Sequence, residues 1–400
     1  MKSPPSEKPP HIPHPADTML IAVVFVVAFS LAACQRQSQP TEVAQAAKPV
    51  QTAPQVEARE LHIANWPDYI QEGAVEAFEK ETGVRVVYDT FKNNEELQKI
   101  LESQPQKYDL VFPGAGWGHA QKESGHFQPL DKTLLTNLSN LDPRMMARLS
   151  TVDPGNRYFV PWGSGYTTVT VNKTMLRAAL GSGELPANAW DLVFDPTWAK
   201  RVSSCGLAYL DSPSEILPLM LLVKGLSPYS ENLADYASAR AELDRVRPFI
   251  KLFTTKTVNA LVSRKVCVAI AFSGDIVIAQ NEMAAAGIKD ELVALFPTSG
   301  SLGFVDVAAI PAQARHPKNA HLFLDYMLRV ENARQFIEEV GYPNGNEKAV
   351  ALLPDSVKGD PIVFPSAAFQ SRLAPPQRFT NPARWEMLSQ YLKFAYNIGE

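Results

Sequence analysis

The chain has 400 residues, of which 46% are hydrophobic and 20% charged, so it can bury one large core and more readily two. Its formal net charge is -4, so acidic residues outnumber lysine and arginine. This balance argues against a nucleic-acid-binding protein. A weakly acidic chain tolerates cationic ligands, although net charge alone does not name one.

The first 57 residues have the features of a targeting segment followed by a tether. Residues 1–33 are predicted to be a signal peptide, because a proline-rich start leads into an apolar run at residues 20–29 and then into small side chains. Residues 31–34 (Leu-Ala-Ala-Cys) resemble a bacterial lipobox, which predicts that Cys34 is lipidated; an anchor that is never cleaved is the alternative. Residues 34–57 are rich in Gln, Ala and Pro and are predicted to be a disordered tether.

Strands and helices alternate from Glu60 onwards. Apolar residues predict strands at 61–64, 84–87 and 108–112, separated by helices around residues 74–78 and 97–101. This β-α-β-α-β order predicts an α/β fold with a mostly parallel, doubly wound sheet flanked by helices. The glycine-rich residues 113–118 follow the third strand and suit a wall of a ligand site, because glycine allows close backbone approach.

Two later segments are predicted to connect two lobes. Residues 158–162 and 166–172 are extended, are separated by Gly163-Ser164-Gly165, and are predicted to lead into a second lobe. A strand at residues 303–311 is predicted to return from it. The expected lobes are residues 58–165 plus 306–345 and residues 166–305 plus 346–400.

Four acidic residues stand in turns that follow strands or open helices. They are Asp68, Glu215, Asp275 and Asp306, and the aromatic residues near them in the sequence are Trp66, Tyr69, Phe272 and Phe304. A short diamine needs this set, because each desolvated ammonium requires carboxylate partners and aromatic faces cover the methylenes. Each acid also has a structural alternative, which is an ordinary turn residue for Asp68, N-capping for Asp275, a helix-dipole contact for Glu215 and a lysine pair for Asp306.

The cysteines predict a disulfide. Once Cys34 is assigned to a lipid, Cys205 and Cys267 remain, and an even remainder in an exported protein favours a bridge between them. Two buried free thiols are the alternative.

From about residue 61 to residue 347 the chain resembles the periplasmic polyamine-binding proteins of ABC transporters, most closely their putrescine-binding branch. The matching segments follow one another in the same order and comprise residues 65–70, 78–83, 87–89, 127–132, 204–206, 266–270 and 304–307. The resemblance implies a two-lobed periplasmic-binding-protein fold of type II that closes on its ligand by a hinge. It also implies a disulfide at the same two cysteines.

The resemblance assigns roles to the acids and aromatic residues. It implies that Asp68 and Asp306 hold one ammonium and that Glu215 and Asp275 hold the other. The residues implied to surround the methylene chain are Trp66, Tyr69, Phe304 and Tyr342, with Phe272 where the family usually has tryptophan. Pro67 and a glycine, Gly114 or Gly116, stand where serines are common in the putrescine branch. The sequence therefore predicts an amine ligand and leaves putrescine, cadaverine, agmatine and spermidine open.

The predicted function is binding without catalysis. We expect a monomeric, lipid-anchored periplasmic receptor that captures a diamine or polyamine and delivers it to an inner-membrane ABC permease. A polyamine sensor that docks onto a membrane signalling protein is the alternative. An enzyme is not predicted, because the seven histidines show no metal-ligand spacing and no Gly-x-Ser-x-Gly motif is present. No cofactor, metal or nucleic acid is expected.

Overall fold

The computed structural model describes residues 57–181, 183–377 and 380–397. The predicted signal peptide, the predicted lipidation site at Cys34 and the predicted tether up to residue 56 lie outside these residues. Across the described part of the chain, no helix is both long enough and apolar enough to span a bilayer.

The strands of the described residues form one mixed sheet. Their bounds are β1 (Glu60–Asn65), β2 (Arg85–Thr90), β3 (Leu110–Val111), β4 (Phe159–Asn172), β5 (Leu207–Leu210), β6 (Leu252–Thr254), β7 (Val268–Phe272), β8 (Leu292–Leu295), β9 (Ser301–Ala309) and β10 (Leu373–Ala374). The order is β2-β1-β3-β9-β4-β7-β5-β6, with β8 also paired to β4 and β10 to β9. Parallel pairs therefore lie towards the two ends of this order, as expected where helices connect the strands.

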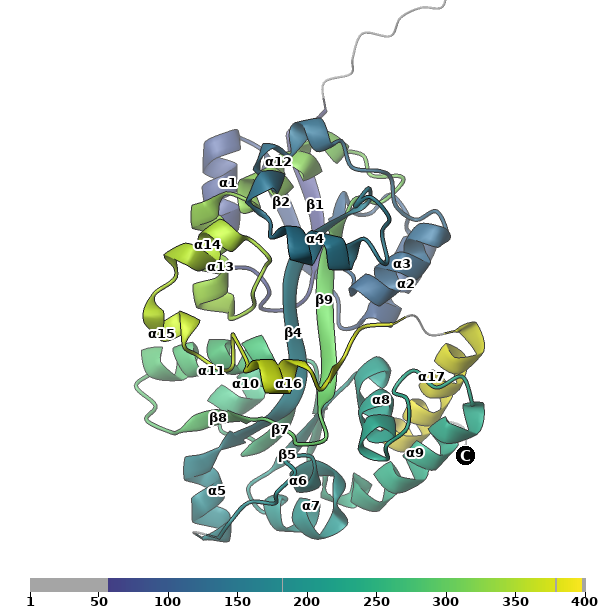
Figure 1. Ribbon diagram of the computed structural model, residues 1–400, viewed down its shortest axis with the longest axis vertical. Helices are drawn as coiled ribbons and strands as arrows, with labels where there is room; N and C mark the ends of the chain where they lie inside the picture. The colour runs from purple at the N-terminus through teal and green to yellow at the C-terminus, as the bar shows by residue number, and fades with distance from the viewer. Residues whose placement is uncertain (1–56, 182, 378–379, 398–400) are drawn as a thin grey trace, which may run out of the picture. The chain divides into compact units, whose positions relative to one another are not determined.

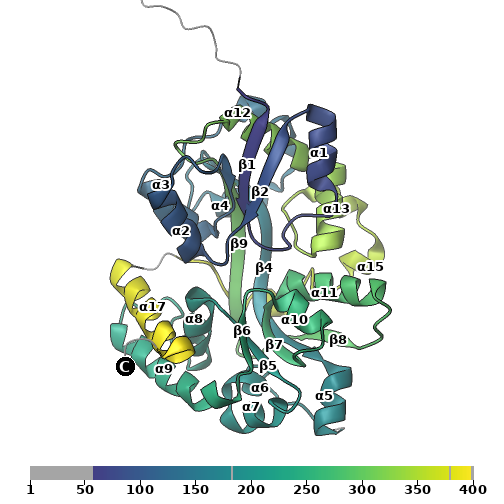
Figure 2. The same ribbon diagram turned by 180° about the vertical axis from the view of Figure 1, so that it is seen from behind.

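Two long antiparallel strands join the parallel groups. β4 pairs with β9 from Phe159 to Tyr166 and then with β7 from Thr167 to Val171. Figures 1 and 2 show β4 and β9 side by side, running from one group of helices to the other. We call the part with β1 to β3 lobe 1 and the part with β5 to β8 lobe 2. The predicted two-lobed type II fold with two crossovers is confirmed.

The helices of lobe 1 and of the first half of lobe 2 come in chain order. Their bounds are α1 (Ala74–Thr82), α2 (Asn94–Ser103), α3 (Ala115–Glu123), α4 (Pro143–Leu149), α5 (Lys173–Leu180), α6 (Asp191–Phe194), α7 (Pro196–Val202), α8 (Pro213–Val223) and α9 (Leu233–Val246). Local signals set several ends. Gly83 ends α1 in the left-handed conformation with φ 69°, and the Asn93 side chain caps α2 by accepting a hydrogen bond from the Glu96 amide.

The remaining helices are divided between the two lobes. Their bounds are α10 (Thr257–Val262), α11 (Ser273–Ala285), α12 (Pro317–Met327), α13 (Val330–Val340), α14 (Glu347–Leu352), α15 (Asp355–Lys358), α16 (Ala367–Gln370) and α17 (Asn381–Tyr396). α12 packs on β1 in lobe 1, whereas α17 packs on α8 and α9 in lobe 2. α14 packs against α13, although the sequence assigns residues 346–400 to lobe 2. The expected boundaries at 165/166 and 305/306 fall inside β4 and β9 and stay predictions.

The glycine-containing break expected between two extended segments is part of one continuous strand. β4 passes through Gly163 and Gly165 with only a register shift between Pro161 and Gly163. A Cβ at Gly163 would overlap the Tyr69 hydroxyl, and one at Gly165 would lie 2.7 Å from the Phe304 ring. These glycines therefore let aromatic side chains approach the crossover strand, rather than ending it.

Cys205 and Cys267 form a disulfide, as predicted. The bridge joins the turn before β5 to the residue before β7, and Leu207 of β5 pairs with Val268 of β7. It therefore crosslinks two neighbouring parallel strands at their amino ends.

Replacement of Cys267 by Ser should lower the melting temperature of the oxidised protein. The bridge closes a sequence separation of 62 residues, for which the chain-entropy model gives ~3–4 kcal/mol. Thermal unfolding of the oxidised wild type, the reduced wild type and the variant measures this contribution, with the reduced wild type as the matched control. Equal melting of all three would contradict a stabilising role.

Candidate ligand-binding site

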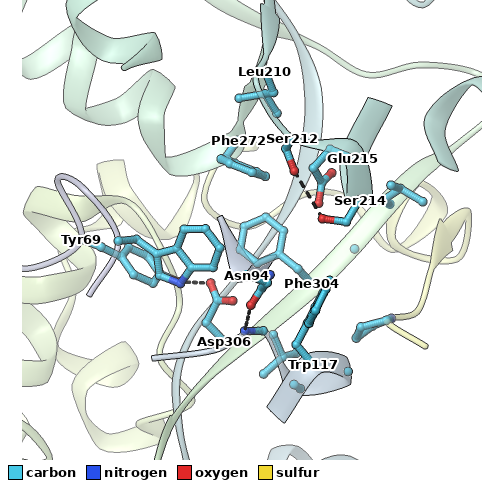
Figure 3. A pocket seen from close by; sticks show the side chains of 18 of the residues that line it. Tyr69, Asn94, Trp117, Leu210, Ser212, Ser214, Glu215, Phe272, Phe304 and Asp306 are labelled. Carbon is cyan, nitrogen blue, oxygen red and sulfur yellow. Dashed lines mark hydrogen bonds between the residues drawn. The ribbon is translucent and has the colours of Figure 1, made fainter. Parts of the chain in front are cut away.

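A cavity of ≈ 130 Å³ lies between the lobes, where several strands end. Its walls come from the turn after β1, the first turn of α3, the first turn of α8, the β7–α11 junction, β9 and the segment after α13. β1, β5 and β7 all present their carboxyl ends to it, which is the edge of an α/β sheet where ligands bind. Both lobes therefore contribute to one site (Figure 3).

Eight of the nine residues predicted to bind the ligand line this cavity. They are Trp66, Tyr69, Glu215, Phe272, Asp275, Phe304, Asp306 and Tyr342. The structure does not bring Asp68 into the lining, because its backbone has a left-handed φ of 54° and its side chain is exposed. Its charge still helps to raise the pKa of Asp275.

Asp306 is held on β9 opposite Gly163 of β4. Its Oδ2 accepts a hydrogen bond of 3.0 Å from the Tyr69 hydroxyl, and both side chains are buried. Burial raises the pKa of Asp306 to about 7, and the Tyr69 hydrogen bond only partly offsets this. No lysine pairs with Asp306 within the described residues, so the expected structural alternative is not seen.

Asp275 lies in the first turn of α11, close to a second tyrosine. Its Oδ1 accepts a hydrogen bond of 3.2 Å from the Tyr342 hydroxyl. Burial raises the pKa of Asp275 to about 7, while the Tyr342 hydroxyl and the Phe272 backbone lower it. Phe272, rather than Asp275, occupies the N-cap position of α11.

Glu215 lies in the first turn of α8, and its Oε2 accepts a hydrogen bond of 2.6 Å from the Thr167 hydroxyl. Burial raises its pKa to about 7; Thr167 lowers it, and the charges of Asp306 and Glu95 raise it further. The charge of Asp306 raises the pKa of Glu215, and the charges of Asp306 and Asp275 both raise the pKa of Tyr69. The three carboxyl groups therefore come from α8, α11 and β9 and line one cavity.

Aromatic rings line the cavity between these carboxyl groups. The Tyr69 and Tyr342 centroids are 4.9 Å apart, those of Tyr342 and Phe304 are 5.9 Å apart, and those of Phe304 and Phe272 are 5.4 Å apart. Trp66 is fixed separately, because its Nε1 donates to the Phe112 carbonyl at 2.7 Å. These faces suit the methylene chain of an alkyl amine and a cation near its ends.

Several lining residues were missed by the sequence analysis. They are Lys92, Asn94, Leu210, Ser212, Ser214, Tyr229, Thr255, Leu302, Gly303, Val305, Pro376 and Gln377, whereas Gly114, Ala115, Gly116 and Trp117 belong to the turn that was predicted to form a wall. Lys92 and Asn94 follow β2, and Ser212 and Ser214 follow β5. Because ligands of α/β sheets bind beyond the carboxyl ends of strands, the position of these four residues in the sequence could have identified them. Asn94 also holds the wall of α3, since its Oδ1 accepts a hydrogen bond of 3.0 Å from the Gly114 amide.

A fourth buried carboxyl group, Glu95, lies near the cavity without lining it. Burial raises its pKa to about 7, and the charges of Arg384 and Lys99 and the Ser214 hydroxyl oppose this rise. Neither carboxylate oxygen accepts a well-formed hydrogen bond within the described residues. The Arg384 Cζ lies 5.3 Å from the Trp117 ring centroid, which places α17 of lobe 2 against α3 of lobe 1.

The described residues hold no cluster of three or more His, Cys, Asp or Glu side chains suited to a metal ion. The cavity lining combines three carboxyl groups, hydroxyl groups, aromatic faces and one lysine, Lys92.

Residues 73–365 match the family of bacterial extracellular solute-binding proteins, and the chain belongs to this family. It is 34% identical to the putrescine-binding periplasmic protein SpuD of Pseudomonas aeruginosa (strain UCBPP-PA14), with 78% of this chain and 85% of SpuD covered. It is 35% identical to the putrescine-binding periplasmic protein PotF of Escherichia coli (strain K12), with 79% and 86% covered. The predicted resemblance to the putrescine-binding branch is confirmed.

A solved structure supports the same assignment. The putative spermidine/putrescine ABC transporter protein from Listeria monocytogenes aligns with a TM-score of 0.74 and 29% identity, covering 85% of this chain and 100% of that one. Because the family consists of solute-binding proteins, the chain is a binding protein and not an enzyme, as the sequence predicted.

The stability of the ligand-free protein should carry an unfavourable contribution from these acids that grows with pH. The pKa values of Glu215, Asp275 and Asp306 are raised to about 7 in the folded state, whereas an unfolded chain has values near ~4. Between these values the folded state binds more protons than the unfolded state, so unfolding free energy falls as pH rises.

Melting curves from pH 4.5 to 7.5 test this in the protein stripped of ligand. The difference between wild type and Asp275→Asn isolates one group, and the variant should gain stability relative to wild type as pH rises. A constant difference across that range would contradict the raised pKa of Asp275.

Proposed function

We propose that the protein binds a diamine or polyamine in this cavity, with a putrescine-like dication as the ligand that fits best. The observation that carries the proposal is that the buried Asp306 and the half-buried Glu215 and Asp275 line one cavity with only hydroxyl groups as side-chain hydrogen-bond partners. None of the three forms an ion pair within the described residues. An ammonium ion would supply the missing positive charge.

The cavity walls support an amine rather than an inorganic cation. A diamine has charged ends and an apolar middle, and the site has acids at separate points with four aromatic rings among them. Asp275 of α11 and Glu215 of α8 are proposed to bind the two ammonium ends, and Asp306 of β9 is proposed to lie beside the chain. This replaces the implied pair of Asp68 with Asp306, since Asp68 does not line the cavity.

Closure of the lobes is proposed to complete the site. Trp66, Tyr69 and Tyr342 approach from lobe 1, whereas Glu215 and Phe272 approach from lobe 2. A ligand that contacts both lobes stabilises the closed arrangement over the open one, and closure excludes water from the charge pairs.

We further propose that the protein works as a receptor for an ABC permease. The relatives SpuD and PotF are named as periplasmic putrescine-binding proteins, and the Listeria monocytogenes structure is named as part of an ABC transporter. A periplasmic location and a lipid tether at Cys34 fit this role and rest on the sequence pattern of residues 1–57, and a monomeric state is proposed with them.

Replacement of Asp306 by Asn should weaken diamine binding strongly. The substitution keeps the shape of the side chain and removes a charge from a desolvated site, which costs ~2–5 kcal/mol when one partner of a buried pair is lost. Isothermal titration of the ligand-stripped protein with putrescine, cadaverine, agmatine, spermidine and spermine gives the affinities.

Asp68→Asn is the matched control, because it removes the same charge from an exposed side chain outside the lining. It should cost less than ~1 kcal/mol. If Asp68→Asn weakened binding as much as Asp306→Asn, the family assignment of Asp68 to the ligand would hold instead. Absence of heat with every amine in wild type would reject the proposed function.

A further inference from the structure

One basic side chain, that of Lys92, lines the cavity among the described residues. It stands in the loop between β2 and α2 and is exposed. Within the described residues its ammonium forms neither an ion pair nor a hydrogen bond. A cation without a partner at the wall of a proposed amine site opposes the ligand that the acids attract.

The backbone of Lys92 is held in place. Its amide donates a hydrogen bond of 2.7 Å to Glu96 Oε2, and the neighbouring Phe91 is buried with its ring centroid 4.6 Å from that of Trp66. Trp66 itself lines the cavity. The backbone of Lys92 is therefore fixed beside the aromatic wall, whereas its exposed side chain forms no hydrogen bond or ion pair within the described residues.

The charges of the lining then match a particular ligand charge. Three carboxylates, Glu215, Asp275 and Asp306, together with the Lys92 ammonium, leave a formal charge of -2 when all four are ionised. Glu95 and Arg384 do not line the cavity, and their opposite charges offset each other. A dicationic amine neutralises the lining, whereas a tricationic amine leaves an excess positive charge.

We propose that Lys92 determines specificity by charge, favouring dicationic amines over amines with three or four charges. This inference rests on the proposed function. Every additional ammonium of the ligand meets the repulsion of Lys92, so the penalty grows with ligand charge wherever the extra group lies in the cavity.

The size of the effect follows from Coulomb's law. A unit charge about 7 Å away, at an effective dielectric constant between about 20 and 80, changes the affinity for one extra ammonium by roughly 3- to 50-fold. Because Lys92 is exposed, the lower part of this interval applies. Salt should screen the effect, since the Debye length falls from about 10 Å at 0.1 M to about 3 Å at 1 M.

The test compares spermidine with putrescine in wild type, Lys92→Gln and Lys80→Gln. Lys80 is an exposed lysine in α1 that does not line the cavity, so its replacement changes the net charge equally and serves as the control. Isothermal titration of the ligand-stripped full-length protein gives the ratio of the two dissociation constants at 0.05 M and 0.5 M NaCl. Melting curves confirm that each variant is folded.

We expect Lys92→Gln to shift the ratio towards spermidine by roughly 3- to 10-fold at low salt, with a smaller shift at high salt. Lys80→Gln should keep the wild-type ratio. A wild type that binds putrescine, combined with an unchanged ratio in Lys92→Gln, would overturn this inference and leave the proposed function standing.

Two other outcomes also count against it. Equal tightening of both amines in Lys92→Gln would show a general repulsion without discrimination. Loss of affinity for both amines in Lys92→Gln would show that the lysine supports the cavity wall. A wild type that binds no amine would reject the proposed function, and this inference with it.

Discussion

Three carboxyl groups that line one cavity with only hydroxyl groups as side-chain partners are the constraint on which the site depends. Water is the usual partner of a carboxylate, and burial removes it, so the pKa values of Glu215, Asp275 and Asp306 rise to about 7. Hydroxyl groups of Tyr69, Tyr342 and Thr167 hold the carboxyl groups without neutralising them. The ligand-free site therefore carries an electrostatic cost that a bound ammonium ion removes, and this links affinity, pH and lobe closure.

The two crossover strands make this arrangement of acids attainable. β9 carries Asp306 and β4 carries Thr167, and both strands pass between the lobes. Gly163 and Gly165 remove side chains where Tyr69 and Phe304 must approach β4. A hinge built from the same strands that carry site residues couples motion of the lobes to the geometry of the cavity. A larger residue at either glycine would disturb both.

The site also differs from a simple acidic pocket. Asp68, which the family resemblance implies at the ligand, is exposed and does not line the cavity, while Lys92 lines it. Both differences reduce the negative charge that the ligand meets. We propose that this charge balance and the aromatic walls contribute to the choice of amine.

Much of the fold was predictable because its signals are local or pairwise. Alternating strand and helix patterns predicted the α/β class, two extended segments predicted the crossovers, and an even cysteine count predicted the bridge between Cys205 and Cys267. Turn position and residue type also marked seven of the lining residues, and the family resemblance added Tyr342. The strand expected at residues 108–112 is shorter, at Leu110–Val111, because strand length depends on partners elsewhere in the sheet.

The sequence by itself determined the two-lobed class, the disulfide and the acid and aromatic set, since each depends on residue type and order. Only the tertiary structure decided which side chains reach the cavity. Tyr69 contacts Asp306 across 237 residues of sequence, and Asp68, with a left-handed φ of 54°, is exposed between two residues that line the cavity. Burial and charge at a site are properties of neighbours brought together by the whole fold, so no local pattern contains them.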